Sequence, residues 1–239
     1  MEALILAGGL GTRLGVLVKD LPKPLLPVGD RPFLDSLIRQ LKGFGITNIT
    51  CLIGYQKEKI KEYFKEGKKL GVHLRYVEEE ELLGTGGAVK AALPLLAAGS
   101  FLLLNGDSFF GTNIPQLIRF HQNHGKGATI ALKELVSPDR YGTVDLSSNN
   151  EVLSFREKDL SKKKGYINAG IYLLEKRIFD QVSLNKFSLE RDLFPKLTEQ
   201  KELHGLPMTG EFIDIGIPED YQRAQELVPH WIALQKGVG

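Results

Sequence analysis

The sequence predicts an α/β fold organised around a parallel sheet. Short apolar runs alternate with amphipathic helical patterns from the amino terminus to residue 77, in the order strand, helix, strand, helix, strand. Such alternation is typical of parallel strands joined by right-handed crossovers. Glycine-rich or polar segments follow the apolar runs at residues 4–6 and 101–104. Because ligands bind beyond the carboxyl ends of parallel strands, these two segments mark the expected functional site.

The elements of the first half follow from the spacing of apolar residues. Residues 4–6 are wholly apolar, as expected of a strand that is buried on both faces. Residues 32–44 place apolar side chains at helical spacing, and Gly45 ends that run. We expect Asp35 and Lys42 on the solvated face of this helix. The same reasoning predicts strands at residues 49–53, 72–77 and 101–104, and helices at residues 57–64 and 89–96.

The second half gives shorter elements. Residues 113–124 predict a helix that Asn113 caps. His121 and His124 are expected on its solvated face, because no Cys or third His accompanies them as a metal ligand. Ser188 is expected to cap a later helix, and a short final helix is expected to contain Trp231. The remaining predictions are strands at residues 129–133, 141–144, 152–157, 166–172 and 212–216, and a helix at residues 218–227.

Composition excludes several classes of protein. The 239 residues carry a formal net charge of +2, so we expect neither nucleic acid nor a membrane surface as the main partner. No apolar run approaches the length of a membrane span, and the first strand follows Met1 directly, so a cytoplasmic protein is expected. Cys51 is the only cysteine and lies in an apolar run, which predicts a buried side chain. We expect a single domain over residues 1–239.

A glycine-rich loop follows the first strand. Gly8, Gly9 and Gly11 have no Cβ, so the backbone N–H groups of this loop can turn towards a bound anion. Thr12 adds a side-chain donor. The loop is not a Walker A motif, because no Gly-Lys-Ser/Thr closes it, and its glycines are wrongly spaced for a dinucleotide fold. On its own, such a loop is more often a tight turn than a phosphate site.

Two cations follow this loop. Arg13 offers a planar fork that suits phosphate oxygens, and Lys23 offers a compact second charge between two prolines that stiffen its segment. Together with the loop, these residues favour the binding of a phosphate-bearing ligand.

Two carboxylates are candidate metal ligands or partners of a cation. Asp107 follows the strand at residues 101–104, across the expected crevice from the glycine-rich loop. A carboxylate there would repel phosphates unless Mg²⁺ lay between them. Asp214 stands among large apolar residues, and a buried carboxylate is costly unless it is paired or metal-bound.

Two sequence blocks carry a family resemblance. Leu-Ala-Gly-Gly-Leu-Gly-Thr-Arg-Leu at residues 6–14 and Pro-Lys-Pro-Leu-Leu-Pro-Val at residues 22–28 resemble the signature of sugar-1-phosphate nucleotidyltransferases. The resemblance extends over almost the whole chain. It implies a Rossmann-like nucleotidyltransferase fold with a mixed, mostly parallel central sheet and a small sugar-binding lobe. Residues 1–110 are then mainly nucleotide-binding, and residues 111–239 form mainly the sugar-binding and C-terminal part.

The resemblance also assigns expected roles to residues. Catalytic roles fall to Arg13, Lys23 and Lys158, and the Mg²⁺ ligands are Asp107 and Asp214. The sugar is expected to contact Gly142, Glu157, Lys158, Asn168 and Glu190. The nucleotide is expected to contact Leu6, Ala7, Gly8, Gly9, Gly11, Thr12, Arg13, Lys23, Gly84, Thr85, Gly86, Asn105 and Gly106.

The reaction implied by the resemblance joins a nucleoside triphosphate to a sugar 1-phosphate and releases pyrophosphate. Leu-Gly-Thr-Gly-Gly at residues 83–87 resembles guanylyl members, so GTP is the expected nucleotide. The late motifs resemble enzymes that act on D-glycero-α-D-manno-heptose 1-phosphate, with mannose 1-phosphate as the close rival. Thymidylyl or uridylyl transfer to glucose 1-phosphate or N-acetylmuramate 1-phosphate, and a non-catalytic regulatory subunit, are further alternatives. The sequence leaves a homo-oligomer open.

Overall fold

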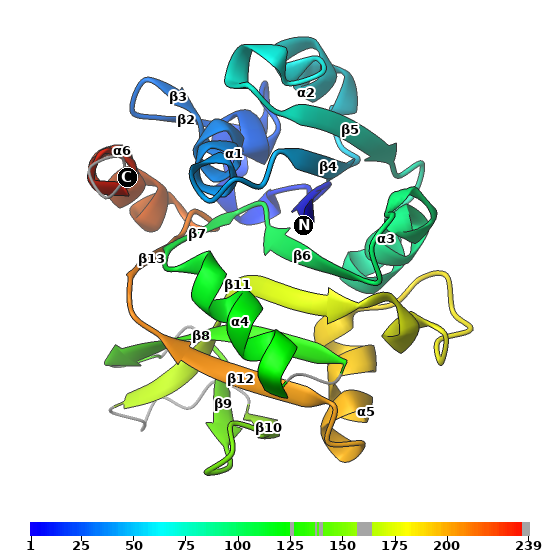
Figure 1. Ribbon diagram of the computed structural model, residues 1–239. Coiled ribbons are helices and arrows are strands. Elements are labelled where there is room, and N and C mark those ends of the chain that lie inside the picture. Colours follow the sequence, from blue (N-terminus) through cyan, green and yellow to red (C-terminus); the bar gives the residue numbers. More distant parts are fainter. Residues whose placement is uncertain (125–126, 137, 139–140, 157–163, 236–239) are drawn as a thin grey trace.

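The computed structural model describes residues 1–124, 127–136, 138, 141–156 and 164–235. Within these residues, the main sheet contains nine strands (Figure 1). Strands β1 (Glu2–Ala7), β4 (Asn48–Ile53), β5 (His73–Glu78) and β6 (Ser100–Asn105) pair in parallel, with β1 between β4 and β6. The carboxyl ends of these four strands therefore meet at one edge of the sheet.

The sheet becomes mixed on the far side of β6. Strand β11 (Lys164–Glu175) pairs antiparallel with β6 and extends into a lobe with other late strands. The predicted mixed, mostly parallel α/β sheet is thereby confirmed. The strands of this lobe are β8 (Ala128–Val136), β9 (Thr143–Leu146), β10 (Val152–Arg156) and β12 (Leu203–Met208).

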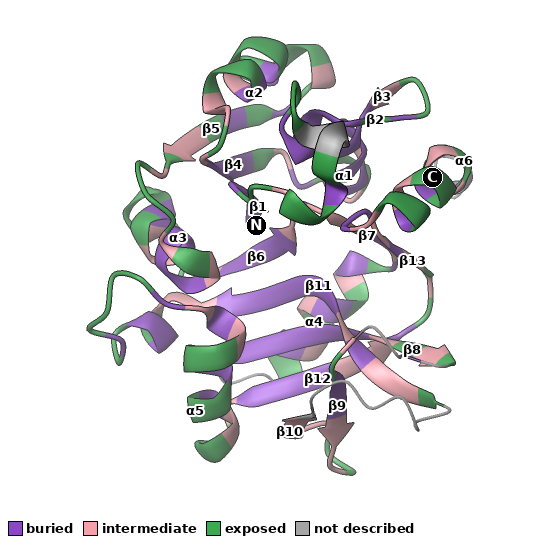
Figure 2. Ribbon diagram, turned by 180° about the vertical axis from the view of Figure 1, so that it is seen from behind, coloured by how far each residue is buried: buried purple, intermediate pink, exposed green. Residues whose placement is uncertain are grey.

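Side-chain alternation along β1 divides the core between the two faces of the sheet. Ala3 and Ile5 pack in a cluster with α1 (Phe33–Gly43) and α4 (Ile114–His124), whereas Leu4 packs in a second cluster. That second cluster includes α3 (Gly84–Ala92) and α5 (Phe194–Glu199). Figure 2 shows that the middle strands are mostly buried while the outer faces of the helices are exposed.

The remaining elements are short or lie at the periphery. They are α2 (Lys57–Phe64), β2 (Pro27–Val28), β3 (Arg31–Pro32), β7 (Ser108–Gly111), β13 (Glu211–Asp214) and α6 (Pro218–Gln235). The 3-10 turns are Thr12–Val18, Lys23–Leu25, Lys68–Leu70, Leu93–Leu95 and Lys176–Phe179, and Leu189–Leu193 is a π-helical turn. Among the described helices, none combines the length and apolar character needed to cross a membrane.

Two of the expected solvated side chains are buried. Asp35 is only 5% exposed, because α1 packs against the 3-10 turn at Lys23–Leu25 and against α6 as well as the sheet, and Asp35 pairs with Arg39 one turn along. His121 is 4% exposed, because α4 lies on β8, where its Nδ1 is 2.8 Å from the Oγ1 of Thr129. The predictions for these two residues were wrong, whereas Lys42 and His124 are exposed as expected.

The predicted break before the final helix was also wrong. Helix α6 continues from Pro218 to Gln235 through Pro229. Pro229 packs against Gly29 in the turn between β2 and β3, where an added Cβ would lie 2.6 Å from its ring. Tyr221 Oη and Gln225 Nε2 each donate a hydrogen bond to Pro27 O at 2.8 Å. Contacts with the hairpin therefore hold the helix where the proline removes one internal hydrogen bond.

Candidate active site

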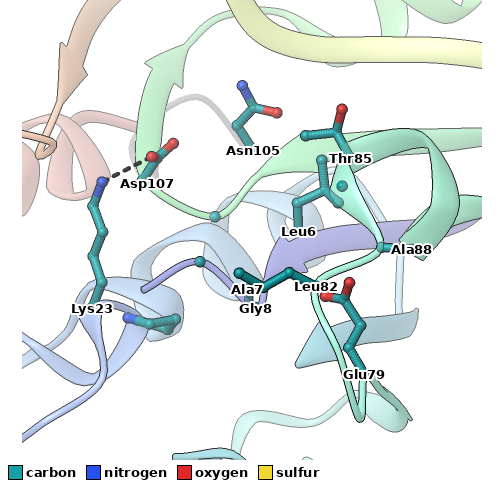
Figure 3. A pocket seen from close by; sticks show the side chains of 14 residues that line it. Leu6, Ala7, Gly8, Lys23, Glu79, Leu82, Thr85, Ala88, Asn105 and Asp107 are labelled. Carbon is teal, nitrogen blue, oxygen red and sulfur yellow. Dashed lines mark hydrogen bonds and ion pairs between the residues drawn. The ribbon is translucent and has the colours of Figure 1, made fainter. Parts of the chain in front are cut away.

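A cavity of about 340 Å³ opens at the carboxyl ends of β1 and β6 (Figure 3). It brings together three segments that the sequence analysis singled out separately. The predicted residues that line it are Leu6, Ala7, Gly8, Gly9, Lys23, Gly84, Thr85, Asn105, Gly106 and Asp107. Pro24, Glu79, Leu82 and Ala88 also line it.

The first glycine-rich loop forms one wall of the cavity. A Cβ added at Gly9 would meet nothing within 4 Å, so this wall has room on its open side. Gly106 lies against β1, because its N–H donates to Leu6 O at 2.9 Å and an added Cβ would lie 2.3 Å from that oxygen. Gly106 thus permits close approach of two strand ends, whereas Gly9 leaves space for a ligand.

Lys23 occupies one end of the cavity. Pro22 is extended before the 3-10 turn that begins at Lys23, and this turn is closed by a hydrogen bond from Leu25 N to Pro22 O. The Lys23 side chain is 9% exposed, and its Nζ donates to Asp107 Oδ2 at 2.8 Å. The ammonium group is therefore held at the cavity by a rigid segment and a single carboxylate.

Asp107 and Asp214 lie together because β7 and β13 pair. Asp214 is opposite Ser108 in that pairing, and Ile215 N donates to Asp107 O at 2.9 Å. Burial first, and the neighbouring charge of Asp107 second, raise the pKa of the Asp214 carboxyl, although Lys23, the Gly216 N–H and Arg13 oppose the shift. The pair is thus a partly buried cluster of negative charge that a cation stabilises.

A divalent cation fits this pair. Lys23 already supplies one positive charge there, and carboxylate oxygens are the ligands that Mg²⁺ prefers. Among the described residues, no three His, Cys, Asp or Glu side chains gather closely enough to hold a metal by themselves. The remaining ligands of an ion at Asp107 and Asp214 would therefore be water or phosphate oxygens.

Arg13 lies near these carboxylates and does not line the cavity. A Cβ at Gly216 would lie 2.9 Å from Arg13 Nη2, and the charge of Arg13 acts on Asp214. Gly11 and Thr12 also lie outside the lining. The structure therefore places Arg13 beside the candidate metal ligands.

The second glycine-rich loop packs against protein. The N–H groups of Gly86 and Gly87 donate to Phe187 O at 3.0 and 3.2 Å, and Phe187 N donates to Leu83 O at 3.0 Å. A Cβ at Gly86 would lie 2.2 Å from Phe187 Cε2, and Gly86 does not line the cavity. Gly84 does line it, with a φ of +75° that favours glycine.

Two of the predicted sugar contacts, Asn168 and Gly142, lie in or beside strands of the lobe. Asn168 Nδ2 donates to Tyr172 Oη at 2.9 Å, across an irregularity in β11. Asn105 Oδ1 is buried and has no hydrogen-bond partner among the described residues. Gly142 is exposed just before β9. Glu157 and Lys158 lie outside the described residues, so their expected roles stay predictions.

Glu79 is a cavity residue that the sequence analysis did not single out, because it is one of four consecutive acidic residues at 78–81 and such runs are usually solvated. Its Oε1 accepts a hydrogen bond from Leu83 N at 3.1 Å, and burial raises the pKa of its carboxyl. Glu79 directly follows β5, at the same sheet edge as the loops after β1 and β6. Sheet topology was therefore the signal that could have identified it.

Comparisons with known proteins agree with this architecture. The family model described as nucleotidyl transferase matches residues 2–230. A D-glycero-alpha-D-manno-heptose 1-phosphate guanylyltransferase of Campylobacter jejuni is 44% identical over 92% of this chain and 97% of that protein. The catalytic subunit beta of a mannose-1-phosphate guanylyltransferase of Drosophila melanogaster is 38% identical over 92% of this chain and 60% of its own length.

A solved structure has a similar fold. The crystal structure of HddC from Yersinia pseudotuberculosis complexed with GMP-PN superposes with a TM-score of 0.84 at 34% identity, over 94% of this chain and 98% of that one. The match of the family model over nearly the whole chain, together with these relatives, gives the assignment. This chain belongs to the nucleotidyltransferase family and is a sugar-1-phosphate nucleotidyltransferase.

Proposed function

We propose that this protein transfers the guanylyl group of GTP to D-glycero-α-D-manno-heptose 1-phosphate, forming GDP-heptose and pyrophosphate. The observation that carries the proposal is the division of the cavity into two chemically different ends. Lys23 and Asp107 lie at one end, and Glu79, Leu82 and Ala88 lie at the other (Figure 3). The charged end suits phosphates, and the other end suits a base.

Glu79 favours guanine at the base end. Guanine presents N1–H and N2–H₂ as neighbouring donors, and one carboxylate can accept from both. Thymine and uracil present a single N–H on the corresponding edge, and they would leave one carboxylate oxygen without a new partner. Glu79 is half-buried and its Oε1 already accepts a hydrogen bond from Leu83 N, so the pocket favours guanine through one additional charge-assisted hydrogen bond.

The phosphate end supplies cations where two anions must meet. The sugar phosphate oxygen attacks the α-phosphorus in line, and pyrophosphate leaves; no covalent protein nucleophile is required. We assign Lys23 to the α-phosphate, Arg13 to the β- and γ-phosphates, and Lys158 to the sugar phosphate. Asp107 and Asp214 would hold Mg²⁺, which when bound neutralises phosphate charge.

The sugar side rests on fewer observations. The relative from Campylobacter jejuni bears the name of a heptose 1-phosphate guanylyltransferase, and the more distant relative from Drosophila melanogaster that of a mannose-1-phosphate enzyme. Glu157, Asn168, Gly142 and Glu190 are the proposed sugar contacts. Because heptose has one more hydroxymethyl carbon than mannose, a pocket that hydrogen-bonds its hydroxyl would discriminate strongly.

A pyrophosphate-release assay tests the proposal with four nucleotides (GTP, ATP, UTP and dTTP) and three sugars (heptose, mannose and glucose 1-phosphate). We expect GTP with the heptose to give a kcat/KM at least tenfold above GTP with mannose, which is about 1.4 kcal/mol of transition-state binding. Equal values, or a preference for mannose, would remove the heptose assignment and leave guanylyl transfer intact. No turnover with any pair would instead favour a regulatory subunit that has lost the reaction.

A further inference from the structure

A hydroxyl group joins the start of α3 to the π-helical turn at Leu189–Leu193. Thr85 lines the cavity as the second residue of α3. Its Oγ1 donates a hydrogen bond to Glu190 Oε2 at 2.8 Å and accepts one from Leu189 N at 2.9 Å. The Thr85 side chain is therefore hydrogen-bonded both to a carboxylate and to a backbone amide that lie more than a hundred positions later in the sequence.

Glu190 is held through one oxygen only. Ser188 Oγ donates to the same Oε2 at 2.8 Å, so two hydroxyl groups bind that oxygen. Among the described residues, no hydrogen bond is made to Glu190 Oε1. This geometry fixes the carboxylate and leaves its second oxygen available to accept a hydrogen bond from a ligand hydroxyl.

Backbone contacts make the two segments one unit. Gly86 N and Gly87 N both donate to Phe187 O, and Phe187 N donates back to Leu83 O. Three backbone hydrogen bonds thus fix the segment before Glu190 on the first turn of α3. A side-chain bond added to such a fixed pair of segments orients Glu190 rather than joining two loose loops.

We propose that Thr85 is a positioning residue for sugar recognition: its hydroxyl aims the Glu190 carboxylate at a hydroxyl group of the sugar 1-phosphate. The second glycine-rich loop and the residues that contact the sugar then form one rigid unit. The inference rests on the proposed function for the location of the sugar, and it names Thr85, a residue expected to contact the nucleotide, as a determinant of sugar affinity.

Thr85→Val tests the inference because valine keeps the shape of threonine and lacks the hydroxyl. We expect the KM for the sugar 1-phosphate to rise about tenfold, while the KM for GTP changes by less than about twofold. Thr85→Ser retains the hydroxyl and should bring the sugar KM back to within about threefold of the natural protein. A Thr85→Val protein whose GTP KM rises as much as its sugar KM would overturn the inference.

Thr112→Val is the matched control. Thr112 is 5% exposed, and its Oγ1 donates to Thr209 O at 2.8 Å, so this change also removes a buried hydroxyl bond. We expect neither KM to change. A similar rise in the sugar KM for Thr112→Val would mean that general loosening of the fold explains the Thr85 result, and the inference would fail.

A double-mutant cycle with Glu190→Gln tests whether Thr85 acts through Glu190. Thr85→Val should add less than about twofold to the sugar KM in the Glu190→Gln background, because the positioned charge is already absent. Multiplied single effects would contradict the inference. If Thr85→Val fails to fold, Ser188→Ala removes the other hydroxyl on Oε2, and a selective rise of about threefold in the sugar KM is expected.

The measurements use whichever sugar 1-phosphate the natural protein turns over fastest. Turnover of mannose 1-phosphate in preference to the heptose would refute the proposed sugar but leave the selective effect of Thr85→Val measurable. A heptose-specific enzyme whose sugar KM ignores Thr85→Val would refute the positioning role alone.

Discussion

The glycine-rich loop after β1 and the glycine-rich loop at the start of α3 line the same cavity, but their glycines have different surroundings. At Gly9 an added Cβ would meet nothing within 4 Å. At Gly86 and Gly87 it would lie 2.2 Å from Phe187 Cε2 and 2.2 Å from Asn185 O. At Gly9 the absence of a side chain leaves open space, whereas at Gly86 and Gly87 it admits another segment of the same chain.

A glycine-rich motif beside a cavity therefore need not bind the ligand. The N–H groups at Gly86 and Gly87 are already bonded to Phe187 O, so they are not free to bind an anion. The first loop instead lies beside Lys23 and Asp107, where charge can be neutralised. Binding of the ligand's charged groups should therefore depend on the first loop, and the stability of the fold should depend on the second.

The largest expected effect belongs to the cation beside the first loop. Lys23→Ala should lower kcat by roughly 10²-fold or more, because it removes a preorganised positive charge from the transition state. Lys42→Ala is the control, since Lys42 is exposed and its Nζ donates a hydrogen bond to Leu70 O, away from the cavity lining. Steady-state assays of both variants check the prediction, and near-normal turnover of Lys23→Ala would refute it.

Asp107 and Asp214 lie on the charged side of the cavity, near the first loop and Lys23. Asp107→Asn and Asp214→Asn should each lower activity at least tenfold at limiting Mg²⁺, because each removes a charged ligand from one shared site. The two effects should not multiply. Titration of activity with Mg²⁺ in both single variants and the double variant is the measurement, and fully multiplicative losses would indicate two independent sites.

Two alanine substitutions compare the loops directly. Gly86→Ala should lower the free energy of unfolding by about 2 kcal/mol, because the Phe187 ring is buried and must shift, and the better helix propensity of alanine offsets only part of that cost. Gly9→Ala should change stability by less than about 0.5 kcal/mol but raise the KM for GTP at least tenfold. Urea denaturation and GTP kinetics measure both quantities, and a stable Gly86→Ala protein would contradict the packing role.

The smallest expected effect concerns Glu79, which lies between the two loops. Its carboxyl has a raised pKa, so it takes up a proton at a higher pH than an exposed glutamate as the pH falls. The protonated form loses acceptor capacity, so the KM for GTP should rise as the pH falls through that pKa. Glu79→Gln should raise this KM about tenfold at neutral pH and remove this part of its pH dependence; an unchanged profile would show that Glu79 does not contact the base.

Much of the fold could be predicted where strands are parallel and buried on both faces. The runs at residues 4–6 and 101–104 that became β1 and β6 are continuously apolar, and the run at residues 49–53 that became β4 is interrupted only by Thr50. Helix α2 has the predicted bounds. Strand β12 was not predicted, because Gly205 and Pro207 weaken its local preference and its pairing with β8 is a long-range contact.

The candidate site was predictable in the same uneven way. Residue type and position after a strand were enough to predict the first loop and Asp107. Lys23 could be predicted from its place between two prolines after that loop. In the sequence, Glu79 cannot be distinguished from the three acidic residues beside it. It lines the cavity because it directly follows the carboxyl end of β5. The bond from Thr85 to Glu190 spans 105 positions, so no local pattern could reveal it.

The hydrogen bonds between α6 and the β2–β3 hairpin join residues that are 194 to 198 positions apart. Closing such a long loop is entropically costly, so contacts of this kind form late in folding. On the ribosome the β2–β3 hairpin is made long before α6, so the adjoining Lys23–Leu25 turn has α1 packed against it but lacks the support that α6 gives to the hairpin. We expect nascent chains arrested before Tyr221 to hold a nucleotide weakly, even though the glycine-rich loop after β1 is among the first residues made.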